Sequence, residues 1–316
     1  MILHPANLRE LTETLAALNT RDEKVASFDL AALNSVVEHT PEDMTATVQA
    51  GMTFADFQKQ LARHGQWLAL DPPHAAGASI GDVLATNASG PRRFGYGTIR
   101  DYLLGIQVAL ADGRLIRSGG KVVKNVAGYD LGKLFVGSRG SLGVIVEATF
   151  KLRPLPEAEQ FVRADCSSLK QAGELLEAIN ESPITPVVLD LHNVFAAPDA
   201  TRCQLVAGFA GTRAEVEWQM AEAHKLGLIA PGDLQHEENF WRLATEAPMH
   251  HLSILPSRLE EVLSSLGEIL FVARAGNGVI HYRGGQPSPS SPSSLAVARR
   301  LKEAFDPKGI LPELPA

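Results

Sequence analysis

The sequence predicts an α+β protein of two domains, and three features carry this prediction. Capped helical patterns alternate with β-branched runs along the chain, as in folds that mix helices with antiparallel sheets. Residues 77–154 hold an unusual share of the glycines, whereas after Pro156 the glycine density falls and a new order of strands and helices begins. A length of 316 residues leaves room for two ordinary domains, each with its own core.

Composition narrows the class of protein. A hydrophobic content of 45% with 21% charged residues is typical of a soluble globular chain. The formal net charge of −7 disfavours nucleic-acid binding, which uses a basic face. The two cysteines, Cys166 and Cys203, lie far apart in the sequence without CxxC spacing, so we expect reduced thiols and no zinc or iron–sulfur site.

Nothing in the sequence predicts a membrane span. No apolar run approaches the ~20 residues that a spanning helix needs. The first residues, MILHPANLRE, lack a basic region followed by an apolar stretch. We therefore expect a cytoplasmic protein and leave open a peripheral attachment to the inner membrane through partner proteins.

The first 73 residues predict strands and capped helices. Leucines at helical spacing predict a helix over residues 6–18, with Asn7 as its cap. A strand is expected over residues 45–50, and Thr53 with Asp56 forms a capping box for a helix that ends near Gly65. A short strand at 66–70 precedes the stiff Asp-Pro-Pro turn at 71–73.

The glycine-dense stretch predicts a ligand site. Glycine lets another group approach the backbone closely, so we expect a ligand to bind near these glycines. Ser79 and Asp82 form a capping box for a short helix, and unpaired N–H groups at such a helix start attract anions such as phosphate. Residues 103–110 and 115–118 flank Asp112-Gly113 and predict a hairpin, and residues 144–152 predict a strand.

Three runs in the chain resemble one family. ASIGDVLATNASGPRRFGYG, KNVAGYDLGKLFVGSRGSLGVIVEATFKLRP and the final FDPKGIL are similar to FAD-linked oxidases of the vanillyl-alcohol-oxidase/PCMH type. Within that family, GPRRFGYG and KNVAGYDL most resemble glycolate oxidase FAD-binding subunits. The resemblance is dense over the first half of the chain and thin beyond it until the tail.

The resemblance implies a domain plan. A PCMH-type FAD-binding domain is expected over residues 1–156, with subdomains at about 1–73 and 74–156. A cap domain follows over 157–285, and residues 286–316 form a linker and a C-terminal helix that returns to the FAD domain. In the cap, strands at 161–166, 186–192 and 203–209 alternate with helices capped by Ser168 and Thr212, an order that suggests a ferredoxin-like fold. Further strands at 251–255, 269–274 and 279–282 and a helix from Ser257 continue it.

The resemblance also implies FAD contacts. The backbone of Ala78, Ser79, Ile80 and Gly81 is expected at the phosphates or ribityl chain. Asn87, Ser89 and Gly90 are expected near the flavin or pyrophosphate, and Tyr96 near the ring. Gly143 and Ile145 are expected on the adenine side. Non-covalent FAD is expected, because the histidine that other members attach to flavin sits in a loop that this chain lacks. His74 is expected to be a partly exposed loop residue.

That loop is the main departure from the family. Members usually have a strand and a glycine-rich loop around the FAD pyrophosphate before the segment that reads DLAALNSVVE here, and backbone N–H groups of such loops cradle phosphate. This chain passes directly from Asn19 through TRDEKVAS to Phe28. Two interpretations stay open: FAD is bound without the loop, or the fold persists without its ligand and the glycines only form turns.

No residue stands out as a catalytic base. His281 lacks the second histidine and the acidic partner of a related metal-binding segment, so we expect it to be packed. His250 and His251 should face opposite sides of a strand, and Trp241 should be a buried anchor. Lys121 and Lys124 either add positive charge near an anionic ligand or lie in a solvated loop.

The resemblance implies an accessory or electron-relaying FAD subunit of a glycolate-oxidase-like 2-hydroxy-acid:acceptor oxidoreductase complex. Such a complex has a second flavin subunit that oxidises the substrate and an iron–sulfur subunit. A flavin-free scaffold subunit is the alternative, and an independent flavoenzyme whose loop is replaced by a partner chain is a third possibility.

Overall fold

The computed structural model describes residues 1–120, 131–195, 202–243, 247–285 and 292–314. By its internal contacts the chain divides into two units. The first unit comprises Met1–Ser89, Thr98–Leu155 and Ser290–Ala316, and the second comprises Gly90–Gly97 and Pro156–Pro289. The domain boundaries stay a prediction, and this grouping differs from them in placing residues 90–97 with the second unit.

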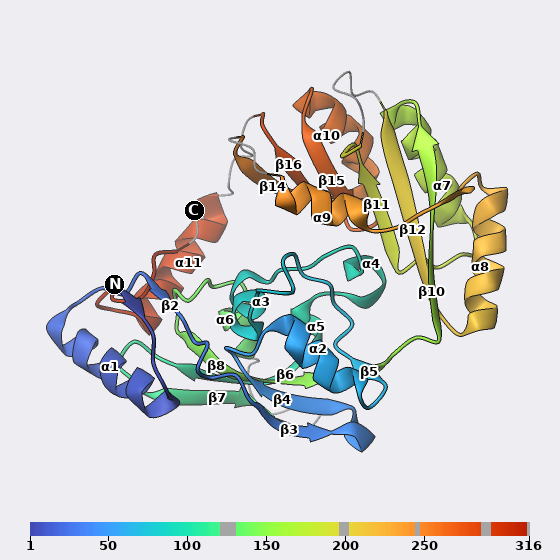
Figure 1. The fold of residues 1–316 in the computed structure, drawn as a ribbon. Coiled ribbons are helices and arrows are strands. Elements are labelled where there is room, and N and C mark those ends of the chain that lie inside the picture. The colour runs from blue at the N-terminus through green and yellow to red at the C-terminus, as the bar shows by residue number, and fades with distance from the viewer. Residues whose placement is uncertain (121–130, 196–201, 244–246, 286–291, 315–316) are drawn as a thin grey trace. The chain divides into compact units, whose positions relative to one another are not determined.

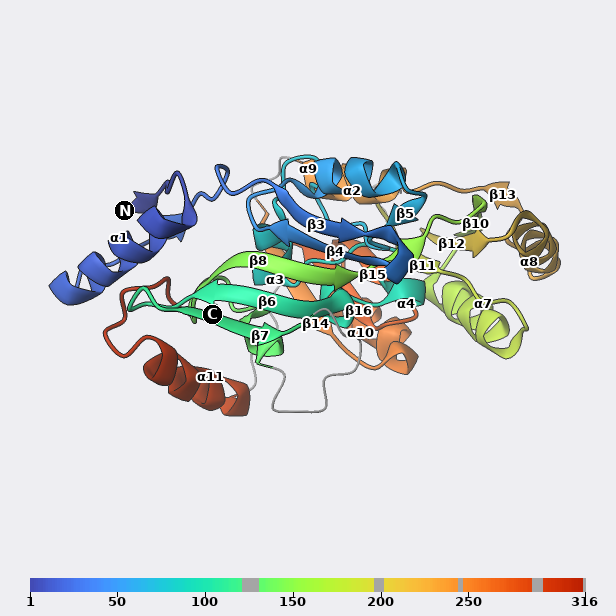
Figure 2. The same ribbon diagram turned by 90° about the horizontal axis from the view of Figure 1, so that it is seen from below.

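A five-stranded antiparallel sheet forms the centre of the first unit (Figure 2). Its strands, in spatial order, are β3 (Val36–Thr40), β4 (Thr45–Gln49), β8 (Val144–Lys151), β6 (Leu103–Ala109) and β7 (Leu115–Gly119). The predicted hairpin is confirmed, because β6 and β7 pair in antiparallel register around the Asp112-Gly113 turn. The strands expected over 45–50 and 144–152 are confirmed as β4 and β8.

Short helices cover the sheet and connect its strands. Helix α3 (Ile80–Thr86) packs on β4 and β8, and the Phe57 ring of α2 (Phe54–Ala62) lies 6.2 Å from that of Phe150 on β8. Thr53 caps α2, and Ser79 with Asp82 forms the predicted capping box of α3. The smaller elements are η1 (Pro41–Asp43), β5 (Gln66–Trp67), α5 (Ile99–Tyr102), α6 (Gly132–Phe135) and β9 (Arg153–Pro154). Strands β5 and β9 pair with each other.

The N-terminal segment is a small β–α–β unit. Strand β1 (Ile2–Leu3) pairs in parallel with β2 (Ser27–Phe28), and α1 (Leu8–Arg21) runs between them. Asn7 caps α1 by accepting the N–H of Glu10, as predicted. The buried leucines of α1 share a core with Ala109 of β6 and Val146 of β8.

The C-terminal segment returns to this same core. Helix α11 (Pro292–Phe305) is followed by a turn that buries Ile310 and Leu311 against α1. The N–H of Val25 donates to the carbonyl of Ile310 at 2.7 Å. The end of the described chain is therefore part of the first unit's structure.

The second unit is built on a seven-stranded antiparallel sheet (Figure 1). Its order is β13 (Ala230–Pro231), β10 (Ala158–Cys166), β12 (Cys203–Gly211), β11 (Val188–His192), β15 (Leu270–Arg274), β16 (Val279–Arg283) and β14 (Met249–Ser253). The sheet has seven strands, three more than the four of a simple ferredoxin-like unit. Helix α4 (Arg93–Tyr96) also belongs to this unit, and Arg92 pairs there with Glu159 at 2.6 Å.

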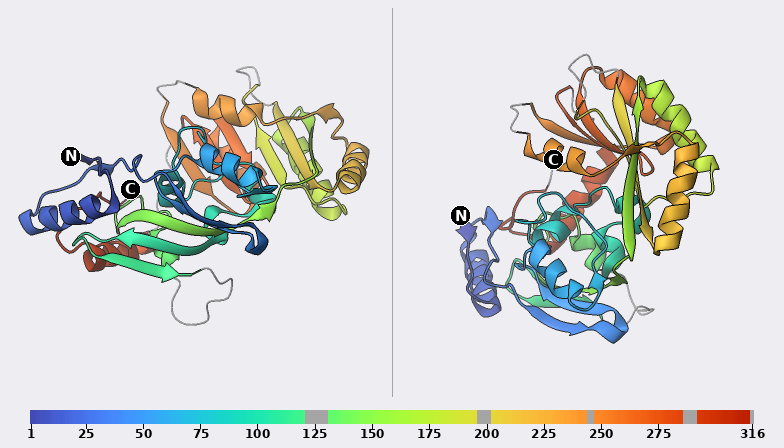
Figure 3. Two further views of the ribbon diagram at one scale, coloured as in Figure 1. Left: turned by 60° about the horizontal axis from the view of Figure 1, so that its bottom comes forward. Right: turned by 45° about the vertical axis from the view of Figure 1, so that its right-hand side comes forward.

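Helices cover both faces of this sheet (Figure 3). Helices α7 (Leu169–Glu181), α8 (Arg213–Lys225) and α10 (Leu259–Leu266) enclose the apolar core on one face, whereas α9 (Gln235–Arg242) lies on the other. Neighbouring residues of a strand point to opposite faces. Thus Ala273 enters the apolar core while Arg274 reaches Glu237 of α9.

Most cap elements match the sequence prediction, but α9 was not predicted. Ser168 and Thr212 cap α7 and α8 as expected. The helix expected from Ser257 begins as the 3-10 turn η2 (Pro256–Arg258) and continues as α10. Helix α9 starts at Leu234 without a side-chain cap, and its sequence QHEENFWR gives no simple apolar spacing.

Candidate functional site

The candidate site is a pocket in the first unit with a volume of about 470 Å³. Four segments far apart in the sequence line it: residues 26–31, 51–53, 77–86 and 139–145, together with Pro312. We call it the α3 pocket, because the start of α3 forms one wall. Its volume lies within the range of about 300–1,000 Å³ that is usual for small-molecule sites.

The α3 pocket brings together four of the ten predicted FAD contacts. Ser79 and Gly81, expected at the phosphates, line it together with Gly143 and Ile145, expected at the adenine. The structure therefore places the two groups in one cavity of a size suited to the nucleotide half of FAD. The individual roles of these residues stay predictions.

The other six predicted contacts are not lining residues of this pocket. They comprise two neighbours at the helix start, two residues after α3 and two residues of the second unit, namely Ala78, Ile80, Asn87, Ser89, Gly90 and Tyr96. Ile80 is fully buried, and the carbonyl of Ala78 accepts the N–H of Phe54. Asn87 ends α3 in the left-handed conformation with a buried Oδ1 that has no hydrogen-bond partner in the described chain.

The predicted unpaired N–H groups at the start of α3 are not there, and this expectation was wrong. The N–H of Ile80 donates to the carbonyl of Met52 at 2.8 Å, and that of Gly81 to the carbonyl of Ala50 at 2.7 Å. The N–H groups of Asp82 and Val83 donate to Ser79. These donors are engaged by the protein itself, so they form no ready cradle for phosphate.

Close packing of α3 against Ala50 explains why position 81 is a glycine, and the sequence did not reveal this contact. A Cβ at this position would lie 3.1 Å from both the Cβ and the carbonyl oxygen of Ala50. The glycine lets α3 approach β4 closely enough for the Gly81–Ala50 hydrogen bond. By contrast, a Cβ at Gly77 would meet nothing within 4 Å, so this part of the pocket wall is open.

Three charged residues line the α3 pocket: Asp29, Asp82 and Arg139. Asp82 accepts the N–H and the hydroxyl of Ser79. Asp29 accepts the N–H of Ala31 and pairs with His4, and these two contacts lower the pKa of Asp29. Neither Asp29 nor Arg139 was predicted to be a site residue, although each lies in a segment that resembles the family.

The pocket fits the nucleotide half of FAD in size and in lining. Glycines and small side chains dominate its wall, which suits a bulky planar base and its sugar. Gly140, which adopts a positive φ of 77°, lies beside Phe28 and Pro312. An aromatic ring and a proline ring therefore lie next to a glycine at this edge of the pocket. Bound flavin would supply the hydride or electron chemistry, and the chain would bind and orient it.

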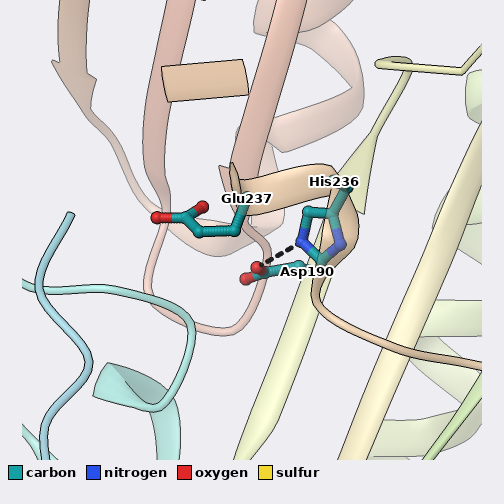
Figure 4. Close-up of side chains that lie close together, drawn as sticks. All are labelled: Asp190, His236 and Glu237. Carbon is teal, nitrogen blue, oxygen red and sulfur yellow. Dashed lines mark hydrogen bonds and ion pairs between the residues drawn. The ribbon is translucent and has the colours of Figure 1, made fainter. Parts of the chain in front are cut away.

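A second group of polar residues is buried in the second unit on β11, β15 and α9. Arg274 donates to Asp190 at 2.6 Å and to both carboxylate oxygens of Glu237 at 2.7 Å. His236 lies 3.0 Å from Asp190 (Figure 4), and Trp241 Nε1 donates to Glu237 at 2.7 Å. We call these residues the Arg274 cluster.

The partners of Asp190 in the Arg274 cluster determine the direction in which its pKa is shifted. Burial alone would raise the pKa of Asp190, but Arg274 and His236 together bring it below its ordinary value. Next to the cluster, His192 stacks on His236 with ring centroids 4.2 Å apart. Burial lowers the pKa of His192 to about 2, so this ring is neutral at physiological pH.

Asp190, His236 and Glu237 also meet the distance criterion for metal ligands, since their ligand atoms lie within 4.8 Å of one another. Arg274, however, already forms an ion pair with each of the two carboxylates. A buried ion pair of this kind depends on each partner, because an unpaired buried charge is costly. The arrangement therefore fits a structural ion-pair network better than a metal centre.

The remaining predicted residues fall into ordinary environments. His281 packs between Trp241 and His251, with ring centroids 5.2 and 5.1 Å away, and burial lowers its pKa to about 3. His250 lies on the opposite face beside Tyr282, as the alternation of a strand predicts. Trp241 is half-buried, and His74 is exposed. Lys121, Lys124 and most of the 286–292 linker lie outside the described residues.

The two cysteines are neighbours in space. Cys166 of β10 and Cys203 of β12 are directly opposed in the antiparallel register, and both are free and buried. They are therefore free thiols in the core of the second unit. The sequence did not predict their proximity, because they lie far apart in the chain and only the pairing of β10 with β12 brings them together.

Comparisons with known proteins agree with this fold and site. Residues 6–119 match the FAD binding domain family. The chain is 29% identical over 314 residues to glycolate oxidase subunit GlcE of Escherichia coli (strain K12), covering 90% of this chain and 85% of the relative. It is 39% identical over 158 residues to glycolate oxidase subunit GlcD of Bacillus subtilis (strain 168), covering 50% of this chain and 34% of the relative.

Residues 6–119 thus carry an FAD binding domain, and the chain is similar to glycolate oxidase subunits along most of its length. FAD is the cofactor of the matched domain. The chain is also 32% identical over 349 residues to the mitochondrial D-lactate dehydrogenase [cytochrome] of Kluyveromyces lactis, covering 92% of this chain and 58% of the relative. It thus spans about a third of the length of GlcD but most of the length of GlcE.

The fold of this chain recurs in solved structures. An alkyldihydroxyacetonephosphate synthase structure superposes with a TM-score of 0.76 at 20% identity, covering 99% of this chain and 76% of that chain. The predicted α+β, PCMH-type fold is thereby confirmed. In the part of the chain that the structure describes, no helix has the length and apolar character needed to cross a membrane.

Proposed function

We propose that this chain is an FAD-binding accessory or electron-relaying subunit of a glycolate-oxidase-like 2-hydroxy-acid:acceptor oxidoreductase complex. In this role it binds and orients flavin while another subunit oxidises the hydroxy acid. The proposal rests on one observation above all: the α3 pocket brings Ser79 and Gly81, two of the four residues expected at the FAD phosphates or ribityl chain, together with the two residues expected at the adenine. The similarity to GlcE along most of both chains supports the same assignment.

The second unit supports an accessory rather than a substrate-oxidising role. A general base must be able to reach the proton that it abstracts. In the Arg274 cluster, both carboxylates are bonded to Arg274, and His236 is bonded to Asp190. His281 is packed against two other rings, and burial lowers its pKa to about 3, which makes the ring a weak base. These groups hold the cap together and leave the chemistry to a partner.

The partners belong to the same proposal. GlcE and GlcD are both named as subunits of glycolate oxidase, which supports an assembly of several chains. We assign to it a second flavin subunit for substrate oxidation and an iron–sulfur subunit as electron acceptor. The complex would be cytoplasmic, with any attachment to the inner membrane made through those partners.

A flavin-free scaffold is the second candidate, and two observations favour it. The N–H groups at the start of α3 are engaged within the protein. The first 50 residues contain no glycine, so they offer no glycine-rich loop for a pyrophosphate. On this alternative the fold is retained for its surfaces alone.

Reconstitution tests these candidates. The chain is co-expressed with the flavin and iron–sulfur subunits of its own complex, then assayed for co-purification, flavin content and oxidation of glycolate and D-lactate. The accessory role predicts flavin on this chain, a stable assembly and turnover only by the complex. Robust turnover by the isolated chain would refute the accessory role and favour an independent flavoenzyme, and an active complex without flavin on this chain would favour the scaffold.

A further inference from the structure

The charge balance of the α3 pocket is unusual for a site that is to hold a dinucleotide. Of its three charged lining residues, Asp29 and Asp82 are acidic, and only Arg139 is basic. A diphosphate would bring further negative charge into this environment. Without a compensating cation, repulsion from the two carboxylates would disfavour it. The described N–H groups at the start of α3 offer no compensation, because they bond within the protein.

Arg139 is placed at the pocket by an uncommon backbone conformation. Its φ is +51°, in the left-handed region that residues other than glycine, asparagine and aspartate rarely adopt. Its N–H donates to the carbonyl of Ala85 in α3 at 2.8 Å, which fixes the residue against the pocket wall. Strained residues of this kind concentrate at functional sites. A glycine at 139 would adopt the same conformation without strain, so the arginine side chain is retained for another reason.

The Arg139 side chain is exposed and has no acidic partner among the described residues. Other arginines of the first unit do have partners: Arg9 pairs with Glu13, and Arg114 pairs with Asp112. A guanidinium offers five donors in a planar fork that matches phosphate oxygens, and it keeps its charge at every physiological pH. Arg139 is therefore available to an anionic ligand.

We propose that Arg139 binds the diphosphate of the dinucleotide in the α3 pocket and replaces the backbone cradle that a glycine-rich loop would provide. This inference rests on the proposed FAD-binding function and names the residue that makes it feasible. A cradle of backbone N–H groups is neutral, whereas an arginine contact is ionic. Binding should consequently weaken as salt concentration rises.

Four proteins test the proposal: the parent chain, Arg139→Gly, Arg139→Lys and the control Arg63→Ala. Glycine adopts a positive φ without strain, so Arg139→Gly should melt at the same temperature as the parent chain or at a higher one. A loss of ligand affinity in this variant would therefore not be caused by unfolding. Arg63 is exposed at the end of α2 and does not line the pocket, so its replacement removes an equal charge elsewhere. The probes are FAD, ADP and adenosine, measured by flavin fluorescence or calorimetry at low and high salt.

Arg139→Gly should lower the affinity for FAD and ADP by about 10- to 100-fold, the usual contribution of a charged hydrogen bond. The affinity for adenosine should be unchanged. Arg139→Lys should keep part of the affinity, and Arg63→Ala should keep all of it. The salt dependence of the parent chain should be reduced in Arg139→Gly. If the parent chain binds FAD and Arg139→Gly binds it with the same affinity, this inference is overturned but the proposed function is not. A parent chain that binds neither FAD nor ADP would overturn the proposed function and this inference with it.

Discussion

The ammonium of Lys302 lies 2.6 Å from the carboxylate of Asp306, and both side chains are largely buried. Lys302 also donates to the carbonyls of Ser141, Leu311 and Pro312, while Asp306 accepts the N–H groups of Ile310 and Leu311. This pair therefore ties α11 and the C-terminal turn to the segment before Gly143. Because Pro312 lines the α3 pocket, the pair also supports one edge of the candidate site.

Replacing Asp306 should destabilise the first unit strongly. Asp306→Ala leaves a buried lysine without its carboxylate and two N–H groups without an acceptor, which together cost about 3–5 kcal/mol. The matched control is Lys308→Ala, which removes an exposed pair with Asp22 and should cost less than about 1 kcal/mol. Calorimetric melting of both variants measures the difference. Equal melting temperatures for the two variants would show that the Lys302–Asp306 pair is not important for stability.

The second unit should lose stability in mild acid because of its buried histidines. The folded pKa of His192 is about 2 and that of His281 about 3, both lowered by burial, against about 6.5 in an unfolded chain. Between these values the unfolded chain binds protons that the folded chain does not. Stability is therefore complete above pH 6.5 and falls with pH below it, by up to about 1.4 kcal/mol per pH unit for each histidine.

His281→Gln should reduce this acid sensitivity. The variant removes one titrating group but keeps a polar side chain against Trp241. Urea unfolding from pH 7.5 to 5 should give a shallower loss of stability for the variant than for the parent chain. Parallel curves over that range would mean that His281 is protonated as easily in the folded protein as in the unfolded one.

Two glycines of the α3 pocket should respond in opposite ways to substitution. A Cβ at Gly51 would lie 1.8 Å from the carbonyl oxygen of Leu30, so Gly51→Ala must displace backbone and should destabilise the first unit by several kcal/mol, about the upper end for point mutations. A side chain at Gly77 meets open space, so Gly77→Leu should fold normally. It should nevertheless lower FAD affinity, because it adds bulk to the pocket wall. Unchanged FAD affinity in Gly77→Leu would place the ligand elsewhere.

The paired thiols should be inert in the folded protein. Cys166 and Cys203 are 3% and 4% exposed, and a hydrogen bond to Cys166, together with burial, raises the pKa of Cys203. Thiol reagents act on the thiolate, so Ellman's reagent should react slowly in buffer and should titrate two thiols in urea. Rapid reaction of the native protein would contradict this buried environment.

The features that the sequence predicted well are those that depend on neighbouring residues. Asn7, Ser79, Ser168 and Thr212 cap helices because each oxygen needs only an N–H two or three residues away. The hairpin at Asp112-Gly113 is equally local. Family resemblance added the fold, since the similar runs span both halves of the FAD domain.

The features that the sequence missed depend on distant segments. The N–H groups of Ile80 and Gly81 looked available because their acceptors, the carbonyls of Met52 and Ala50, come from another part of the chain. The Arg274 cluster joins β11, α9 and β15, and no spacing rule connects them. Helix α9 is held by these same contacts rather than by a cap, which is why it went unpredicted.

We propose that this chain binds FAD without a glycine-rich pyrophosphate loop. The most direct measurement is the visible spectrum of freshly purified protein, followed by titration with FAD under flavin fluorescence. If the chain binds FAD, the protein should be yellow with close to one flavin per chain, or FAD should show saturable quenching at micromolar concentrations. A colourless protein whose addition leaves flavin fluorescence unchanged would refute FAD binding and identify the chain as a scaffold.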